Sequence, residues 1–377
     1  MPAPRSPVRV TGKRVFIVTI SRLVGGRIRL GATLLLMALL ATPSAATLEP
    51  AQTFLMTAFN LSTAEIGRLD HGEVVSRTLE VSNRREVATL GIVRINTSAS
   101  TYVERLADIT TFKRTDDVLQ IGIFGSPPQA ADVASLVIDD TDLKQLRRCR
   151  VDDCEARLSA EGIERVRHEI DWRAADASSK ASLLVRQTLV DHVARYLQSG
   201  TAAAMEYADR LPRVNVGREF ASLVDADPIT SRYAPRLRRH LLAFPMSSAE
   251  KVTDFVYWSK ERVRGRPVIS ITHVATAAAV DDSPVAYAVG SKQIYAMHYY
   301  DASLGLTLLV PDRTAASPAT YVVYLNRSRI DLFDGLFGGV ARRIVAGRAR
   351  VLVAEQLQRL QRVLADKSSL DAGSRGR

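Results

Sequence analysis

The stretch VAYAVGSKQIYAM, residues Val285–Met297, is the first of three strand-like runs that decide the fold. The other two are Leu304–Val310 (LGLTLLV) and Tyr321–Leu332 (YVVYLNRSRIDL), separated by the turn-rich segment PDRTAASPA. Several glycines then lead into a run with helical spacing that continues to about residue 365. Its apolar residues fall roughly on one stripe, made of Ile344, Val345, Val351, Leu352, Leu357, Leu360 and Leu364. This order predicts antiparallel strands with one long terminal helix lying across a curved sheet.

The first third of the chain carries elements that suit the same sheet. A first helix is expected over Ala51–Ile66, and another over Ser98–Leu106, which begins with capping residues. Strand-like runs follow the first helix and return after the middle of the chain; they are Glu73–Val81, Ala88–Ile95, Val118–Phe124, a short one at Leu136–Ile138, Val252–Trp258 and Pro267–Thr276. We therefore expect one α+β sheet that both ends of the chain share.

The opening of this sheet resembles a known family. Gly72-Glu73-Val74-Val75 begins the first strand, and the second strand ends in GIVRI at Ile95. The segment from Ala99 to Phe112 then contains Tyr102-Val103, Leu106 and Asp108. This pattern resembles START-like lipid-binding domains of the SRPBCC superfamily, which the terminal sheet and helix also fit. The sequence departs from the family pattern at Ser100, where a proline is usual, and at Tyr102-Val103, where Val-Trp is usual. The resemblance implies a helix-grip fold that holds a lipid-like molecule between sheet and terminal helix.

The middle of the chain differs in character, because its pattern is helical. Helices are expected at Asp142–Arg148, Ala160–Arg167, Ser179–Leu197, Ala202–Arg210 and Arg218–Leu223, with prolines at 212, 228, 235 and 245 as dividers. It is interpreted either as an insertion into the START-like domain or as a separate helical domain. The predicted organisation is a signal peptide at 1–46, domain halves at 47–141 and 251–365, a helical insertion at 142–250 and a disordered tail at 366–377.

Residues 1–46 are typical of an export signal. Basic residues precede the apolar run Leu34–Leu40, and small residues follow it up to Ala46. The uninterrupted apolar run from Gly31 to Pro43 is too short to span a bilayer of about 30 Å. The sequence therefore predicts a cleavable signal peptide and a periplasmic location, with a membrane anchor as the alternative.

Removing this leader changes the charge of the protein. The leader carries seven basic and no acidic residues, so its loss lowers the net charge from +11 to +4. A mildly basic mature chain predicts no nucleic-acid partner. The densest remaining basic stretch lies on the terminal helix and is expected to be a solvated face. A contact with a membrane surface is the alternative, through Arg342, Arg343, Arg348 and Arg350.

The only two cysteines, Cys149 and Cys154, lie in the polar segment RCRVDDC. In an exported protein this spacing predicts a local disulfide. The chain lacks the nucleophile elbow, the zinc-protease motif and the glycine-rich nucleotide loops. Histidine is scarce, with six residues, which argues against a multi-histidine metal centre. We therefore predict no catalytic residue, no cofactor and no metal site.

The segment SKQIYAMHYYDAS, residues Ser291–Ser303, is the densest candidate for a functional site. Strand alternation places Gln293, Tyr295, Met297 and Tyr299 on one face, which suits an apolar cavity with a few polar anchors. Ordinary strand packing explains the same tyrosines equally well. The next strand adds polar candidates, so that the predicted ligand-binding set is Gln293, Tyr295, Met297, Tyr299, Tyr324, Asn326 and Arg327.

The preferred function is non-enzymatic binding of a hydrophobic or amphipathic, lipid-like small molecule. One alternative is an exported hydrolase-like enzyme in which Asp301 orients His298 beside Lys292. Another alternative is an envelope scaffold that contacts a partner protein through the helical middle of the chain. Structural roles for His298 and Asp301 are favoured over catalysis.

Overall fold

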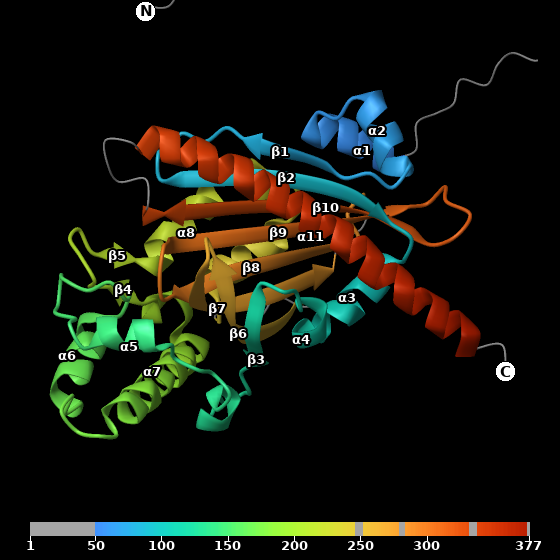
Figure 1. The fold of residues 1–377 in the computed structure, drawn as a ribbon. Helices are drawn as coiled ribbons and strands as arrows, with labels where there is room; N and C mark the ends of the chain where they lie inside the picture. Colours follow the sequence, from blue (N-terminus) through green and yellow to red (C-terminus); the bar gives the residue numbers. More distant parts are fainter. Residues whose placement is uncertain (1–49, 246–251, 279–282, 332–337, 375–377) are drawn as a thin grey trace, which may run out of the picture. The chain divides into compact units, whose positions relative to one another are not determined.

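The computed structural model of the protein describes residues 50–245, 252–278, 283–331 and 338–374. The signal peptide expected at residues 1–46 lies outside these ranges. One eight-stranded antiparallel sheet forms the centre of the fold, in the order β1-β2-β10-β9-β8-β7-β6-β3 (Figure 1). Its strands are β1 Val75–Leu79, β2 Glu86–Ile95, β3 Val118–Ile123, β6 Val252–Val263, β7 Arg266–Ala278, β8 Tyr287–Ala296, β9 Tyr300–Asp312 and β10 Ala319–Ile330. The expectation that both ends of the chain share one sheet is confirmed.

Pairing between β2 and β10 joins the two ends of the chain. Leu90 lies opposite Leu325, and Ile92 lies opposite Val323, so branched apolar residues meet in register. On the other side of the sheet β6 and β7 form a hairpin through Arg264 and Gly265, which both have positive φ angles, as a tight type I′ hairpin turn requires. The distant strands β3 and β6 also pair, which makes β3 the edge strand opposite β1 and brings the two ends of the helical middle region to adjacent strands.

The terminal helix α11 (Gly338–Ser374) packs on one face of the sheet, mainly over β1 and β2 (Figure 1). Gly91 of β2 allows close approach, because a Cβ atom there would lie 2.4 Å from a methyl of Val353. The helices α3 (Ala99–Ala107) and α4 (Ile109–Phe112) lie on the same face, where Tyr102 and Phe112 make an edge-to-face ring contact at 5.3 Å. The fold is therefore α+β, with a large antiparallel sheet and a C-terminal helix packed on it.

The apolar stripe predicted for this helix is wrong in its first half. Ile344 and Leu352 are 60% and 50% exposed, whereas Val353, Leu357 and Leu364 are buried. The helix is covered only where it crosses β2, and its earlier turns contact the sheet through the smaller Val345, Ala346 and Ala349. It also continues to Ser374, past the expected end at residue 365, because residues 366–372 contain neither proline nor glycine.

Helices from the middle of the chain cover the opposite face of the sheet. They include α5 (Asp140–Leu146), α6 (Ala160–Glu169), α7 (Ala177–Ser199), α8 (Val216–Asp225), α9 (Pro228–Tyr233) and α10 (Pro235–Ala243). The sequence pattern does not predict α9 and α10, because it treats Pro228 and Pro235 as dividers between helices. Each proline occupies the first turn of a helix, where its missing N–H costs no hydrogen bond.

Three further expectations differ from the structure. The first helix is split into α1 (Pro50–Phe59) and α2 (Thr63–Asp70), because Ser62 and Glu65 form a capping box that starts a new helix. Leu136–Ile138 is not a strand. Its backbone is instead bonded by the Gln120 side chain, which donates to the Ser135 carbonyl and accepts from the Val137 N–H. The helix expected at Ala202–Arg210 is a 3-10 turn followed by a short strand pair, β4 (Glu206–Tyr207) and β5 (Val214–Asn215).

The predicted disulfide between Cys149 and Cys154 is confirmed. It closes a loop of the helical middle region and is consistent with an exported protein. Within the described ranges, no helix combines the length and the apolar character needed to span a bilayer.

Candidate ligand-binding floor beside the terminal helix

Polar side chains form a band across the central strands on the face that carries α11. Val322 and Val289 pack in the same cluster as Val353 and Leu357, so alternate residues along β10 and β8 point to this face. The register places Ser328 opposite Ser303, Thr272 opposite Gln293, and Ser259 opposite Ser270. We call this band the polar floor; it comprises Asn326, Ser328, Ser303, Ser291, Gln293, Thr272, Ser270, Ser259 and Glu261.

Most of the polar floor is bonded within itself. The hydroxyls of Ser303 and Ser328 lie 2.8 Å apart, and Ser328 donates to Asn326 at 2.9 Å. At the other end, Ser259 donates to Glu261 at 2.5 Å. Gln293 is the exception, because its Oε1 atom is buried and has no hydrogen-bond partner among the described residues. A buried carbonyl oxygen of this kind leaves an acceptor for a donor group of a ligand.

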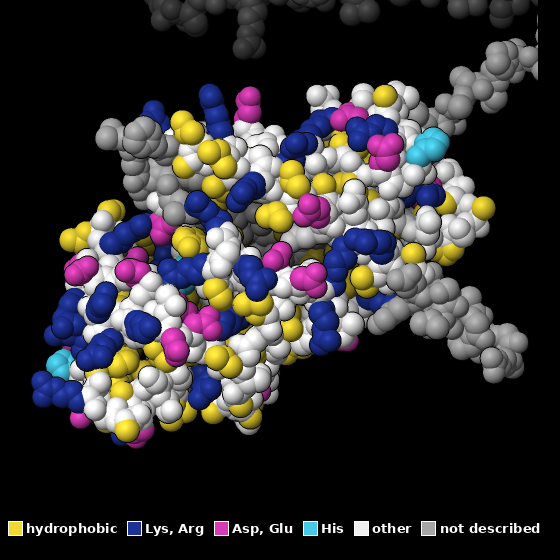
Figure 2. Space-filling model, viewed as in Figure 1, with side chains coloured by type: hydrophobic (Ala, Val, Ile, Leu, Met, Phe, Trp, Pro, Cys, Tyr) yellow, Lys and Arg dark blue, Asp and Glu magenta, His cyan; other side chains and the backbone are white. Residues whose placement is uncertain are grey.

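The polar floor lies in the middle of the sheet, but no helix covers it completely. Ser291, Gln293, Tyr324 and Asn326 are all half-buried, whereas the same strands are fully covered on their opposite face. The cause is the position of the helices on this face. The helix α11 lies over β1 and β2, whereas α3 and α4 contact β9 and the edge strand β3. Figure 2 shows this face, and its surface is hollowed beside the terminal helix.

An ion pair closes one end of the polar floor. Lys113 Nζ, just after α4, lies 2.6 Å from Glu261 Oε1, and both side chains remain 28% exposed. Desolvation acts to raise the pKa of Glu261, but Lys113 outweighs it and holds this pKa below its ordinary value. Neighbouring groups therefore desolvate this ion pair in part, while water still reaches it.

Tyrosine side chains form the walls above the polar floor. Tyr102, Tyr257 and Tyr324 share side-chain hydrogen bonds with Thr307, Thr272 and Asn326 respectively. Burial raises the pKa of each phenol, so all three stay neutral at physiological pH. Neutral hydroxyls beside apolar rings can bind both the polar and the apolar part of a small molecule.

The structure brings together only part of the predicted ligand-binding set. Gln293, Tyr324 and Asn326 share the face of α11. Strand alternation breaks after Gln293, because Thr272 pairs with Gln293 and the preceding Ile271 pairs with Tyr295, which leaves Ile294 unpaired in a β-bulge. The expectation that Tyr295 and Met297 face the same way as Gln293 is therefore wrong.

The remaining predicted residues have other surroundings. Tyr295 and Met297 are fully buried against α7 on the opposite face, where the Tyr295 hydroxyl donates to the Arg157 carbonyl at 3.0 Å. Arg327 also points to that face and binds Glu86 through its Nε at 2.8 Å. Tyr299 has a positive φ of 68° in the turn before β9 and packs beside the first turns of α11.

The residues of the alternative acid–base set lie in three different clusters. His298 Nε2 lies 3.1 Å from Asp142, Asp301 binds Arg157 and Arg85, and Lys292 donates to Thr201 and to the Leu241 carbonyl. No hydrogen bond joins His298, Asp301 and Lys292 to one another among the described contacts. Each of the three has a structural role that explains its burial.

Sequence reasoning missed several residues of the floor and its walls, above all Lys113, Glu261 and the serines. A signal for them was present, because Tyr257, Ser259 and Glu261 alternate along one strand. Polar residues at period two in several strands that share one sheet indicate a polar face. Only the register between the strands shows that these faces join into one band.

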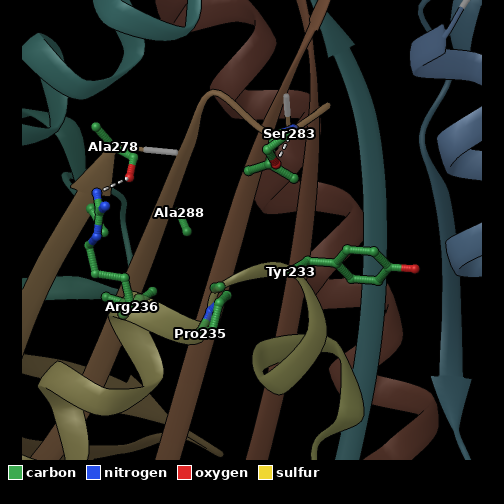
Figure 3. Close-up of a pocket in the computed structure, with 10 residues that line it drawn as sticks. Tyr233, Pro235, Arg236, Ala278, Ser283 and Ala288 are labelled. Carbon is green, nitrogen blue, oxygen red and sulfur yellow. Dashed lines mark hydrogen bonds between the residues drawn. The ribbon is translucent and has the colours of Figure 1, made fainter. Parts of the chain in front are cut away.

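A small pocket lies on the opposite face of the sheet. It lies where α9 meets α10, encloses about 20 Å³ and has room for about one water molecule (Figure 3). Arg236 crosses it and donates to the Ala278 carbonyl at 3.2 Å, while the Tyr233 side chain points away from it.

No protein-family model matches the chain, and no curated protein matches it significantly.

Proposed function

We propose that the protein binds an amphipathic small molecule in the hollow beside α11. The polar part of the molecule lies on the polar floor, with a donor group toward Gln293, and the apolar part lies against the tyrosine walls and α11. The unpartnered Gln293 Oε1 carries this proposal, because a buried acceptor without a donor costs about 1–3 kcal/mol unless a ligand satisfies it. The polarity of the floor favours an amphipathic ligand over a wholly hydrophobic one.

The architecture supports a START-like interpretation of this binding site. Under the proposal, the sheet and α11 form a helix-grip domain, and the segment 142–250 is an insertion between β3 and β6. The insertion covers one face of the sheet and leaves the α11 face for the ligand. The disulfide supports a periplasmic location for this binding protein.

A matched pair of tyrosine variants tests the proposal. Purified protein is extracted with organic solvent for mass spectrometry of bound amphiphiles, and is then titrated with a fluorescent fatty acid. Tyr324→Phe and Gln293→Leu should weaken binding about tenfold, as expected for one lost polar contact of about 1.4 kcal/mol. Tyr295→Phe, the same substitution on the opposite face, should leave affinity unchanged. Equal affinity of all four proteins, or no bound amphiphile in either assay, would contradict the proposal.

An exposed patch of α11 supports contact with an anionic membrane as a second function. Val340, Ile344, Val351 and Leu352 are between 47% and 61% exposed. Arg343, Arg348 and Arg350 are exposed on the same helix. A helix that combines exposed apolar residues with arginines is typical of binding at a lipid surface. Vesicles with anionic lipid should retain the protein in flotation, and Arg343→Glu with Arg348→Glu should release it; equal flotation of both would exclude this function.

A further inference from the structure

Two buried histidines and an aspartate converge on the face of the sheet opposite the polar floor. His240 Nε2 lies 2.8 Å from Asp254 Oδ1, and His273 Nε2 lies 2.7 Å from the same oxygen. The side-chain ligand atoms all lie within 4.8 Å of one another. His240 belongs to α10, Asp254 to β6 and His273 to β7, so three packed elements position the cluster.

We propose that His240, Asp254 and His273 form a binding site for a divalent transition-metal ion, with Zn²⁺ as the best fit. Two imidazole nitrogens and one carboxylate oxygen are a common protein ligand set for such ions. A tetrahedral zinc ion with bonds of about 2.0–2.1 Å needs ligand atoms roughly 3.3 Å apart. The nitrogen-to-oxygen separations therefore need to widen by about half an ångström, and the two nitrogens, which lie within 4.8 Å of each other, need to reach the same spacing.

The burial of the cluster fits a site with an open position. His273 is fully buried and His240 is 5% exposed, while 26% of the Asp254 side chain is exposed. An ion can therefore enter from the side of Asp254, and water completes its coordination there. Three protein ligands with a solvent-accessible fourth position characterise exchangeable and catalytic zinc sites.

A second layer of side chains holds His273 in the orientation that a metal needs. The Tyr196 hydroxyl from α7 lies 2.8 Å from His273 Nδ1. When Nε2 binds an ion, Nδ1 carries the proton and donates it to this hydroxyl, which is the outer contact usual for metal-bound histidine. Phe244 packs against the ring of His273 at 4.5 Å and against Tyr196 at 5.3 Å between centroids, so neither ring is free to turn.

This metal site is independent of the proposed amphiphile binding, because the sheet separates the two. The cluster faces α7 and α10, and the polar floor faces α11. The neighbouring Lys292 does not occupy the site, since its ammonium group bonds Thr201 and the Leu241 carbonyl.

Zinc titration of the purified, chelator-treated chain tests the proposal. Isothermal titration calorimetry should show one Zn²⁺ bound per chain, and Co²⁺ should give the visible absorption bands of a four-coordinate site. Asp254→Asn and His240→Gln should each weaken zinc binding more than about a hundredfold, since even outer contacts contribute about tenfold to a hundredfold. Tyr196→Phe should weaken binding about tenfold and leave the number of bound ions unchanged.

His168→Gln is the matched control, because His168 is an exposed histidine on α6 and does not contact the cluster. It should bind zinc like the unmodified protein. Far-ultraviolet circular dichroism establishes that each variant is folded, and His240→Gln serves as the second ligand variant if Asp254→Asn unfolds. A failure of the unmodified chain to bind zinc, or equal binding by both folded ligand variants, would overturn the proposal.

Discussion

Arg157 and Asp301 form an ion pair of 2.8 Å in which both side chains are almost completely buried. Arg157 comes from the helical middle of the chain and also binds Asp331, whereas Asp301 begins β9 and also binds Arg85. Desolvation raises the pKa of Asp301, although both arginines oppose it. The pair therefore links the helical middle region to the sheet. Because both side chains are buried, loss of either partner would leave an unfavourable unpaired charge.

Removing one partner of this pair should strongly destabilise the fold. Arg157→Met leaves Asp301 buried with only Arg85, and the free energy of unfolding should fall by about 3–5 kcal/mol in urea denaturation. Arg68→Met is the control, because the pair of Arg68 and Glu73 is more than half exposed. It should change stability by less than about 1 kcal/mol. Similar losses for both variants would mean that burial of the Arg157 pair has no special importance.

The stability of the protein should rise with pH above neutrality because of Lys292. Burial lowers the pKa of Lys292 to about 7 in the folded chain, whereas an unfolded lysine has a pKa of about 10.4. Between these values the unfolded chain binds a proton that the folded chain does not, so the free energy of unfolding increases with pH. Below pH 7 Lys292 is protonated in both states, so it no longer makes the free energy of unfolding depend on pH.

Urea denaturation between pH 7 and pH 10 measures this effect. Lys292→Met should remove a pH-dependent gain on the order of 4 kcal/mol. Lys180→Met on α7 should keep the full gain, because the Lys180 side chain is exposed and pairs with Asp176 at the surface. A Lys292→Met protein with an unchanged pH slope would show that the folded pKa is ordinary.

The contact between Gly91 and the terminal helix should be sensitive to one added methyl group. A Cβ atom at position 91 would lie 2.6 Å from Leu357 Cδ1 and 2.4 Å from Val353 Cγ1. Gly91→Ala should cost about 1–3 kcal/mol of unfolding free energy by overpacking this interface. The cost should shrink in a Leu357→Ala background, which a double-mutant cycle measures. Additive costs would place the strain elsewhere. Gly67→Ala, in the open interior of α2, should instead stabilise by about 0.5–1 kcal/mol.

The disulfide should contribute modestly to stability. Cys149 and Cys154 are five residues apart, and closing so short a loop in the unfolded chain corresponds to about 2 kcal/mol. Replacing both cysteines with alanine should lower the unfolding free energy by this amount, and a reducing agent should then have no further effect. If a reducing agent still lowers the unfolding free energy of the alanine variant, the agent acts on a group other than this disulfide.

The sequence was informative where one local pattern decided the outcome. The hairpin at the start of the sheet, the strands of the last third and the disulfide follow from alternation, turns and cysteine spacing. The unpaired Ile294 could not be predicted, because a β-bulge arises from pairing with β7 and not from β8 alone. It reversed the side chains of Tyr295 and Met297, which are two of the seven predicted ligand-binding residues.

Long-range proximity explains the other missing parts of both sites. Six scattered histidines argued against a metal centre, yet the fold places His240 and His273 against one oxygen of Asp254. Lys113 and Glu261 are likewise distant in sequence and meet only because β3 pairs with β6. Such sites depend on the complete strand order, which no local pattern contains.

The pairing of Leu90 with Leu325 has a consequence for biogenesis. When the ribosome has made β2, more than two hundred residues must still be synthesised before its neighbour β10 exists. During that interval β2 has β1 on one side and an open, apolar edge on the other, which is a surface that other chains can join. A nascent or truncated chain that lacks β10 should therefore be a preferred client of chaperones, and deletions near the C-terminus should cause aggregation rather than a smaller folded domain.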